Sequence, residues 1–368
     1  MTHSMKYARG FSLVETMISL TIGLILIAAV GYAYLGGRAA YRQQEALARM
    51  QEGVRFAFET MTYDIRMAGF TGCRATTSAS VLSGTNWFGN LYSQPLVGFE
   101  AASMPAEITA SVVAGDALAV LRADNSNEYI VTSHNPSAAQ FNLGANHDLQ
   151  QGEILVVTDC NHSATFQMTD PNVGNTNSNL VHNTGNTTTP GNCTKGFGES
   201  APGSGVPTCT TLGVPYTFGP GSRILRMSGN IYYIANNPNA IPSLYRLRLS
   251  AGGGNAGGTA EELVEGVEDL QITYGVDTSN PATCSQSDGV VDAYVDADAV
   301  LATAPCATAA DDWKKVLSVR IRMLMRTENG IVSQPQSYFY ANPLVATTAT
   351  DRRLRKVFTA TIGVRNRL

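Results

Sequence analysis

A single carboxylate stands at the head of the longest uncharged stretch of this chain. Glu15 is followed by a run from Thr16 to Gly37 that contains no charged residue. As a helix this run would be about 33 Å long, which is enough to cross the core of a bilayer. A carboxylate at the edge of hydrocarbon is costly unless a cation pairs with it. Cleavage of the chain after Gly10 would create such a cation, the free amine of Phe11.

The cysteines favour disulfide chemistry over metal binding. The chain has six, which are Cys73, Cys160, Cys193, Cys209, Cys284 and Cys306. No pair has the C-x-x-C spacing of a zinc or thioredoxin-like site, so we expect disulfides formed in an oxidising compartment. Six cysteines allow fifteen connectivities, among which the sequence does not choose. Proximity along the chain favours Cys193 with Cys209 and Cys284 with Cys306, which leaves Cys73 with Cys160.

Four aspartates close together in the sequence are the one candidate for a metal site. They are Asp288, Asp292, Asp296 and Asp298. Clustered carboxylate oxygens suit calcium, but the spacing departs from that of an EF-hand loop, and acidic solvated loops are common. Calcium is therefore a weak candidate, and no other cofactor is expected.

No group of residues has the pattern of an active site. Four histidines lie singly in predicted polar loops or at strand ends, where solvated or hydrogen-bonded roles are expected: His134, His147, His162 and His182. The segment Gly198–Pro202 fails the nucleophile-elbow pattern at its last position. Gly252–Gly257 satisfies G-x-G-x-x-G, but no Rossmann-like helix follows, so a flexible turn is expected. We therefore expect a protein that is not an enzyme.

A long helix must position Glu15. Residues 1–10 are a basic leader with Lys6 and Arg9, which should keep the start of the helix on the cytoplasmic side, and both Met1 and Met5 are possible starts. We expect residues 11–37 to span the inner membrane once. Residues 38–70 carry one apolar stripe at steps of three and four and should continue the helix outside the membrane.

Two ordinary classes of N-terminal segment also fit part of this sequence. A secretory signal peptide cut near Gly31 fits the apolar core loosely, and a plain signal anchor fits its hydropathy. Neither gives Glu15 a role, so both are disfavoured.

Residues 71–368 have the pattern of a β-rich head. Short runs of β-branched and apolar residues alternate with Asn, Gly and Asp, as in strands such as Ile154–Thr158 and Leu244–Leu249. Ser228–Asn230 indicates a hairpin turn between two strands. Residues 170–222, rich in Asn, Thr, Gly and Pro, are too long for an ordinary loop, so they should be functional or mobile, stapled by their two cysteines.

The C-terminal end is basic. From Lys314 to Leu368 there are eleven Lys and Arg and two Asp and Glu, whereas the whole chain has a net charge of −4. Apolar and basic residues alternate in Val319–Arg326, which predicts a half-buried strand with a solvent-facing edge. Such a face could attract DNA, but matching by acidic segments of the same fold is the favoured explanation.

The N-terminal pattern resembles the class III signal of type IV pilins and pseudopilins. In that signal a basic leader ends in Gly, followed by Phe-x-x-x-Glu and an apolar helix, as in Gly10, Phe11 and Glu15. The resemblance implies that a prepilin peptidase cleaves after Gly10 and methylates Phe11. It also implies that Glu15 pairs with the N-terminus of a neighbouring subunit.

Further segments are similar to the PilW family of minor type IV pilins. They are Ile65–Phe70, Gly72–Cys73, Thr158–Cys160, Ser243–Arg246, Leu263–Asp277 and Arg353–Leu368. The resemblance implies an α+β, type IV pilin-like fold in which the long N-terminal helix packs on a large antiparallel β-rich head. It also implies a periplasmic head, and a final place at the pilus tip on the cell surface.

The same resemblance implies a function. A minor pilin of this kind joins other minor pilins and the major pilin in a complex that primes pilus assembly, supports a PilY-type tip adhesin, and serves motility or adhesion. A minor pseudopilin of a type II secretion system is the near alternative. A tip-located adhesive or DNA-binding module is the other, with residues 170–222 as its candidate surface.

Overall fold

The computed structural model describes residues 12–100, 103–170, 178–185, 188–201, 204–278, 288–303, 313–340 and 346–365. Gly10, Phe11, Cys284 and Cys306 lie outside these ranges. The elements within them are α1 (Leu13–Met67), β1 (Thr77–Ser80), β2 (Leu96–Phe99), α2 (Ala106–Thr109), β3 (Val112–Asn135), β4 (Gln140–Leu143), β5 (Ile154–Thr158), β6 (His162–Gln167), β7 (Asn179–Val181), β8 (Arg223–Asn236), β9 (Pro242–Gly252), β10 (Asn255–Glu265), β11 (Val267–Val276), β12 (Ala293–Val295), α3 (Ala297–Thr303), β13 (Val316–Gly330), β14 (Ser337–Phe339), β15 (Ala346–Thr348) and β16 (Arg353–Gly363).

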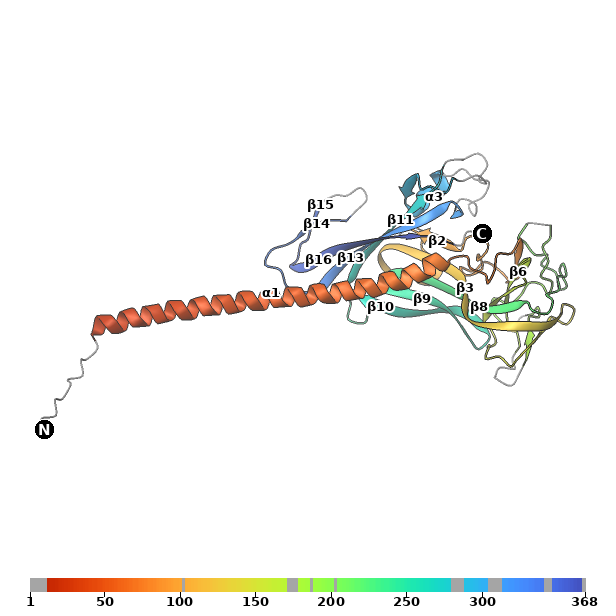
Figure 1. The fold of residues 1–368 in the computed structure, drawn as a ribbon, viewed down its shortest axis with the longest axis horizontal. Coiled ribbons are helices and arrows are strands. Elements are labelled where there is room, and N and C mark those ends of the chain that lie inside the picture. The colour runs from red at the N-terminus through yellow and green to blue at the C-terminus, as the bar shows by residue number, and fades with distance from the viewer. Residues whose placement is uncertain are drawn as a thin grey trace, which may run out of the picture.

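Helix α1 projects from a β-rich head, with its N-terminal half clear of the rest of the chain (Figure 1). The helix has no internal proline and ends at Met67, two residues before Gly69. Gly69 adopts a φ of 76°, which is left-handed and favours glycine. The Gly69 N–H then donates to the Leu121 carbonyl at 2.9 Å, so the end of the helix is hydrogen-bonded to strand β3.

The head is built from two main sheets. In the described residues the larger has ten strands, with the path β1-β6-β5-β8-β3-β4-β7 and with β2, β9 and β10 paired alongside. The smaller has four, in the order β12-β11-β13-β16, and β14 pairs with β15 separately. The described pairings are antiparallel except β1 with β6. The predicted α+β class with a helix packed on a β-rich head is therefore confirmed.

The hairpin predicted at Ser228–Asn230 is wrong, because β8 runs unbroken through these residues. A Cβ added at Gly229 would lie 3.0 Å from Cζ3 of Trp87, so the glycine gives that indole room to lie on the sheet. Asn230 points to the opposite face of β8 and donates to a carboxylate of α1. Gly229 and Asn230 therefore contribute to side-chain packing on opposite faces of the sheet.

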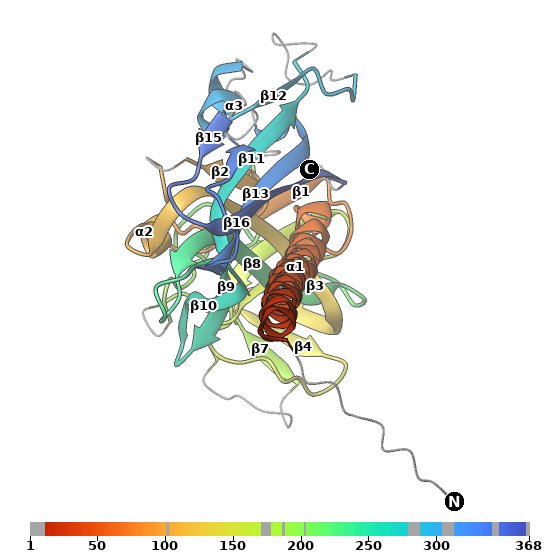
Figure 2. The ribbon, with the colours of Figure 1, turned by 90° about the vertical axis from the view of Figure 1, so that its left-hand side faces the viewer.

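The C-terminal half of α1 lies along the junction of the two sheets (Figures 1 and 2). Its buried stripe comprises Met50, Val54, Ala57, Met61, Asp64 and Ile65. The apolar members share one core with residues of the large sheet, such as Leu118 and Tyr232, and of the small sheet, such as Ile321. The predicted apolar stripe is confirmed, and the helix joins the two sheets into one head.

Asp64, a charged residue inside that stripe, was not predicted. It is 3% exposed, and its two carboxylate oxygens accept three hydrogen bonds. Arg122 Nε of β3 donates at 3.0 Å, Asn230 Nδ2 at 2.6 Å and Tyr232 Oη at 2.5 Å. A buried ion pair persists when further hydrogen bonds satisfy its remaining lone pairs, and that condition holds here. The signal in the sequence was an aspartate on an otherwise apolar helix face.

The end of the head furthest from the N-terminus has its own aromatic core (Figure 1). We call this end of the head the distal lobe. It comprises β4, β6, β7 and the described residues of 178–222. Phe141, Phe166, Phe197 and Phe218 are completely buried there. Disulfide Cys193–Cys209 staples the lobe, and Cys73–Cys160 ties the chain after α1 to the β5–β6 turn, as the sequence predicted.

The four histidines in and beside the distal lobe are buried and hydrogen-bonded, so the expected hydrogen-bonded role holds, whereas the expectations of solvated and of single residues are wrong. His134 Nδ1 accepts the Phe218 N–H at 3.2 Å, so its Nε2 carries the proton and donates to Nε2 of His182 at 3.2 Å. Burial lowers the pKa of His134 to about 4 and that of His182 well below its usual value. His147 and His162 are buried as well. Burial in the aromatic core keeps the histidine pair neutral.

Removing the buried carboxylate should destabilise the head. We expect Asp64→Ala to lower the free energy of unfolding by about 3 kcal/mol, because buried Arg122 would lose its close partner and keep only the more exposed Asp124 carboxylate, 3.7 Å away. The measurement is urea unfolding of the detergent-solubilised full chain, followed by circular dichroism. Glu59→Ala is the control, since Glu59 forms an exposed i,i+4 pair with Arg55 that should contribute about 0.5 kcal/mol.

A double variant separates loss of the charge pair from loss of packing. Asp64→Leu combined with Arg122→Met should recover much of the stability that Asp64→Leu alone loses, because it leaves no unpaired buried charge. Equal losses in the single and double variants would contradict this account.

The buried histidine pair should make stability fall in mild acid. The pKa of His134 is lower in the folded chain, about 4, than its usual 6.5, so the unfolded chain binds more protons between these values. Stability is therefore lost as the pH falls from 6.5. We expect the wild type to lose about 2 kcal/mol more than His134→Gln on going to about pH 5. Parallel pH profiles for the two proteins would rule out His134 as the cause.

Candidate assembly interface

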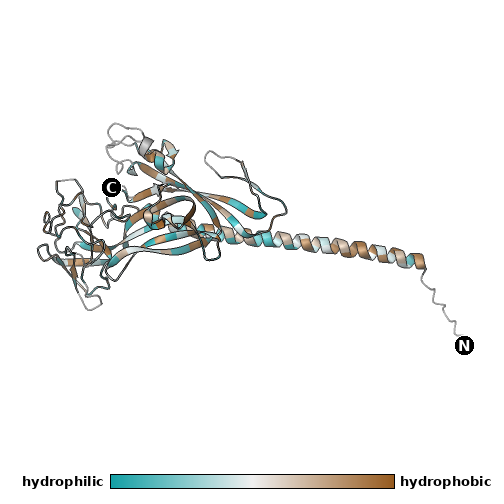
Figure 3. Ribbon diagram, turned by 180° about the vertical axis from the view of Figure 1, so that it is seen from behind, coloured by the Kyte–Doolittle hydropathy of each residue, from teal (hydrophilic) through white to brown (hydrophobic). Residues whose placement is uncertain are grey.

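The free half of α1 presents an apolar surface on all sides. Large side chains from Leu13 to Leu35 are more than half exposed, and the head covers none of them. Figure 3 shows this half as a nearly continuous hydrophobic stretch. By length and composition α1 is long and apolar enough to cross a membrane. Water is a poor solvent for such a surface, so lipid or other apolar helices must cover it.

Glu15 lies in the first turn of this helix. A carboxylate at that position complements the positive end of the helix dipole. The backbone carbonyl of Glu15 accepts the Ser19 hydroxyl at 2.7 Å, but the carboxylate has no partner among residues from Ser12 onward that the structure describes. Gly10 and Phe11, the predicted processing residues, lie outside the described residues. The Glu15 carboxylate is therefore without a cationic partner in the part of the chain that the structure describes.

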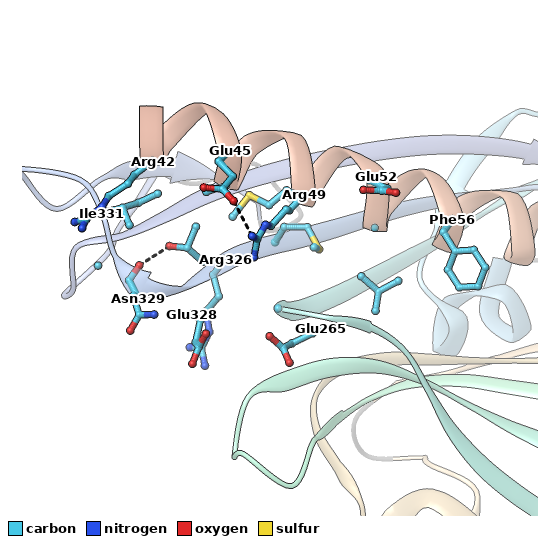
Figure 4. Close-up of a pocket in the computed structure, with 18 of the residues that line it drawn as sticks. Arg42, Glu45, Arg49, Glu52, Phe56, Glu265, Arg326, Glu328, Asn329 and Ile331 are labelled. Carbon is cyan, nitrogen blue, oxygen red and sulfur yellow. Dashed lines mark hydrogen bonds and ion pairs between the residues drawn. The ribbon is translucent and has the colours of Figure 1, made fainter. Parts of the chain in front are cut away.

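A groove opens where α1 enters the head, and we call it the neck groove (Figure 4). It has a volume of about 940 Å³ and lies between residues 42–56 of α1 and two strand ends, 263–266 and 325–331. Met50, Val264 and Met325 contribute apolar surface, while charged side chains from both sides surround them. Gln43 Nε2 donates to the Ile331 carbonyl at 3.2 Å, which ties the helix to the head at this level.

The helix approaches the sheet closely beside this groove. A Cβ added at Gly53 would lie 2.8 Å from Cγ1 of Val264, so glycine is what allows this contact. Glu45 and Arg49, which line the groove, form an exposed i,i+4 ion pair, and Arg55 and Glu59 form another further along the helix. The neck groove thus combines an apolar floor with charged side chains that are accessible to neighbouring molecules.

The four aspartates proposed for calcium do not form a metal site. Asp292 Oδ2 accepts from the backbone and the hydroxyl of Thr278, and Asp288 Oδ1 accepts from the Val290 N–H. Asp298 lies in the first turn of α3. No three His, Cys, Asp or Glu side chains in the described part of the chain are placed to hold a metal ion.

The basic C-terminal strands are matched within the fold. Arg355 donates to both carboxylate oxygens of Glu268, at 2.6 and 2.9 Å, and to Asp351. The Arg355 guanidinium lowers the pKa of Asp351 to about 2. Arg320 stacks over the Tyr294 ring at 3.5 Å. The alternation of β13 is confirmed, but β13 lies inside the four-stranded sheet, so the prediction of a solvent-facing edge is wrong.

The remaining sequence motifs have local roles. Gly253 and Gly254, with φ of 58° and 84°, form the turn between β9 and β10, so the G-x-G-x-x-G match is a hairpin turn. Residues 188–201 and 204–222, which belong to the distal lobe, expose Val206 and Leu212. Cys284 and Cys306 cannot be placed, because they lie outside the described residues.

Comparison with known families agrees with this architecture. The family model described as type IV pilus-assembly protein W matches residues 231–366, which include β9, β11, β13 and β16. The model of the prokaryotic N-terminal methylation motif matches residues 5–31, which include Glu15. No curated protein and no solved structure matches the chain. The two family matches, at opposite ends of a chain with an exposed apolar helix and a β-rich head, support a PilW-family type IV minor pilin.

Proposed function

We propose that this pilin joins a low-copy complex that primes assembly of the pilus and stays at its tip. The observation that carries the proposal is the division of α1 into a bare apolar half, headed by Glu15, and a half held firmly by the head. Such a helix can move from lipid into a bundle of pilin helices without disturbing the head. The match to a pilus-assembly family favours a pilus over a type II secretion pseudopilus.

Entry into the fibre requires that Glu15 lose its charge or gain a partner. Prepilin peptidase cleaves after Gly10 in this proposal, and the new amine at Phe11 of a neighbouring subunit pairs with the Glu15 carboxylate. Pairing of the two charges offsets the cost of taking the acid into an apolar helix bundle. Each subunit then supplies a carboxylate to one neighbour and an amine to another.

The head faces the periplasm before assembly and the cell exterior afterwards. The disulfides Cys73–Cys160 and Cys193–Cys209 suit such oxidising surroundings. The distal lobe lies furthest from the membrane, so it is the part that contacts a tip adhesin of the PilY type. The other partners are minor pilins and the major pilin, which contact α1 and the neck groove. No catalytic step belongs to this function.

Processing and incorporation should separate in two variants. Gly10→Val should block cleavage, so the membrane form keeps residues 1–10, whereas Glu15→Val should be cleaved normally. In Glu15→Val we expect the fraction of the protein found in sheared pili to fall at least about tenfold, because one buried charge pair is lost. The measurement is the mass of the N-terminal peptide from membrane and pilus fractions.

The matched control is Glu59→Val, an exposed carboxylate on the covered half of the same helix, which should be processed and incorporated like the wild type. Incorporation of Glu15→Val at the wild-type level would overturn the pairing role. An N-terminus at Met1 or Met5 in wild-type cells with active peptidase would overturn the whole proposal.

A further inference from the structure

A second cavity lies on the face of the large sheet that is turned away from α1. Its volume is about 340 Å³, and its walls come from residues 85–94, β2, β3 and α2. In β3, Leu118 and Val120 join the core under α1, whereas the alternating residues Ala117 and Ala119 join a separate cluster on the other face. Ala119 lines the cavity. Figure 2, seen along α1, shows α2 on the opposite flank of the head from the helix.

Two aromatic rings form the apolar part of this cavity. Trp87 and Phe99 both line it and are only half-buried, so part of each ring stays open. Trp87 is held in place by the sheet, because its six-membered ring lies against Gly229 and its ring meets Phe88 edge-on at 5.5 Å. A ligand can stack on the open part of this indole. Because the ring is already fixed, binding does not lose free energy to ordering it.

Asn86 Nδ2 of the lining donates to the Ser83 carbonyl, but three other polar lining residues have unused hydrogen-bonding groups. Asn90, Gln94 and Glu107 line the cavity, and their side chains make no hydrogen bond to the residues that the structure describes. Each carboxamide offers both donors and an acceptor, and the carboxylate offers acceptors alone. Polar groups that converge on an aromatic-lined cavity fix the orientation of a small ligand.

This combination matches one class of ligand. A pyranose ring has an apolar face of C–H groups, which stacks on an aromatic ring, and a rim of hydroxyls that donate and accept hydrogen bonds to amides and carboxylates. No Lys or Arg is among the described residues lining the cavity, and Glu107 adds a negative charge, which disfavours phosphate-bearing ligands such as DNA. We propose that the cavity binds a neutral saccharide, stacked on Trp87 and hydrogen-bonded to Asn90, Gln94 and Glu107.

This site adds a binding activity to the assembly role. Because α1 and the neck groove serve assembly, a cavity on the other face of the sheet stays open to solvent in the fibre. It also differs from the surface of residues 170–222, which the sequence had favoured for adhesion. The pilin would thereby contact a glycan on a host or neighbouring cell directly.

The test uses the tryptophan that lines the cavity. The chain has 2 tryptophans, and the other, Trp313, is 7% exposed and packs edge-on against Tyr274, so Trp313→Phe leaves Trp87 as the sole reporter. The full chain is kept in a detergent without a sugar headgroup, since an alkyl maltoside would compete for the site. Lactose, maltose and N,N′-diacetylchitobiose are titrated to millimolar concentrations.

We expect a saturable change in Trp87 fluorescence with at least one disaccharide. Gln94→Ala and Glu107→Ala should each weaken that binding about three- to tenfold, the effect of losing one hydrogen bond, with unchanged unfolding midpoints. Asn146→Ala, which removes an exposed carboxamide elsewhere on the head, should bind like the parent.

Two results would overturn the proposal. One is the absence of a saturable change with all three disaccharides, or a change that Gln94→Ala and Glu107→Ala leave unaltered. The other is saturable binding at Trp87 of a single-stranded oligonucleotide or a proline-rich peptide in place of the saccharides. Incorporation into pili is measured separately, so failure of saccharide binding leaves the assembly role intact and can be told apart from it.

Discussion

The buried contact between Asp64 and Arg122 fixes how the helix lies on the head. Taking both charges out of water is costly, and the cost is offset because Asn230 and Tyr232 donate to the same carboxylate. Apolar packing alone allows a helix to slide or rotate by small steps, since one methyl group can replace another. A carboxylate with three directed donors does not allow this. This group therefore fixes the register of α1 on the large sheet, while apolar contacts hold the helix against the small sheet.

Because α1 is fixed on the head, the two halves of this helix have different surroundings. Residues up to about Arg42 have no cover in the head, while the stripe from Met50 to Ile65 is sealed between the sheets. The uncovered half is apolar around its circumference, so it is stable only in lipid or among similar helices. In the proposed assembly, Glu15 near the start of this half is the group that needs a partner before the helix enters apolar surroundings. The proposed assembly role follows from this division.

The head also has two sides with different surroundings. The face of the large sheet under α1 is closed by the helix, whereas the opposite face carries a cavity with half-buried aromatic rings and unpaired amides. The strand β8 serves both: Asn230 and Tyr232 bind Asp64 on one face, and Gly229 supports Trp87 on the other. The same ten-stranded sheet thus holds the long helix on one face and carries the cavity proposed for saccharide binding on the other.

Features that depend on neighbouring residues were predictable. The apolar run after Glu15, the stripe of α1 and the alternation of β13 each repeat at the period of their element, so the sequence alone indicates helix, strand and buried face. The two disulfides within the described residues also agree with the simplest pairing of the cysteines. The motifs of the processing site are equally local, which is why Gly10, Phe11 and Glu15 could be singled out.

Features that depend on distant residues were decided by the tertiary structure. Asp64 meets partners 58 and 166 positions further along the chain, and His134 meets His182, 48 positions away. Gly229 and Asn230 look like a turn in sequence, but contacts with Trp87 and Asp64 require them within a strand. Four aspartates close in sequence did not converge, while the cavity gathers residues from four separate segments. Sequence period determines which face of an element is buried, but only the packed fold determines which side chains meet there.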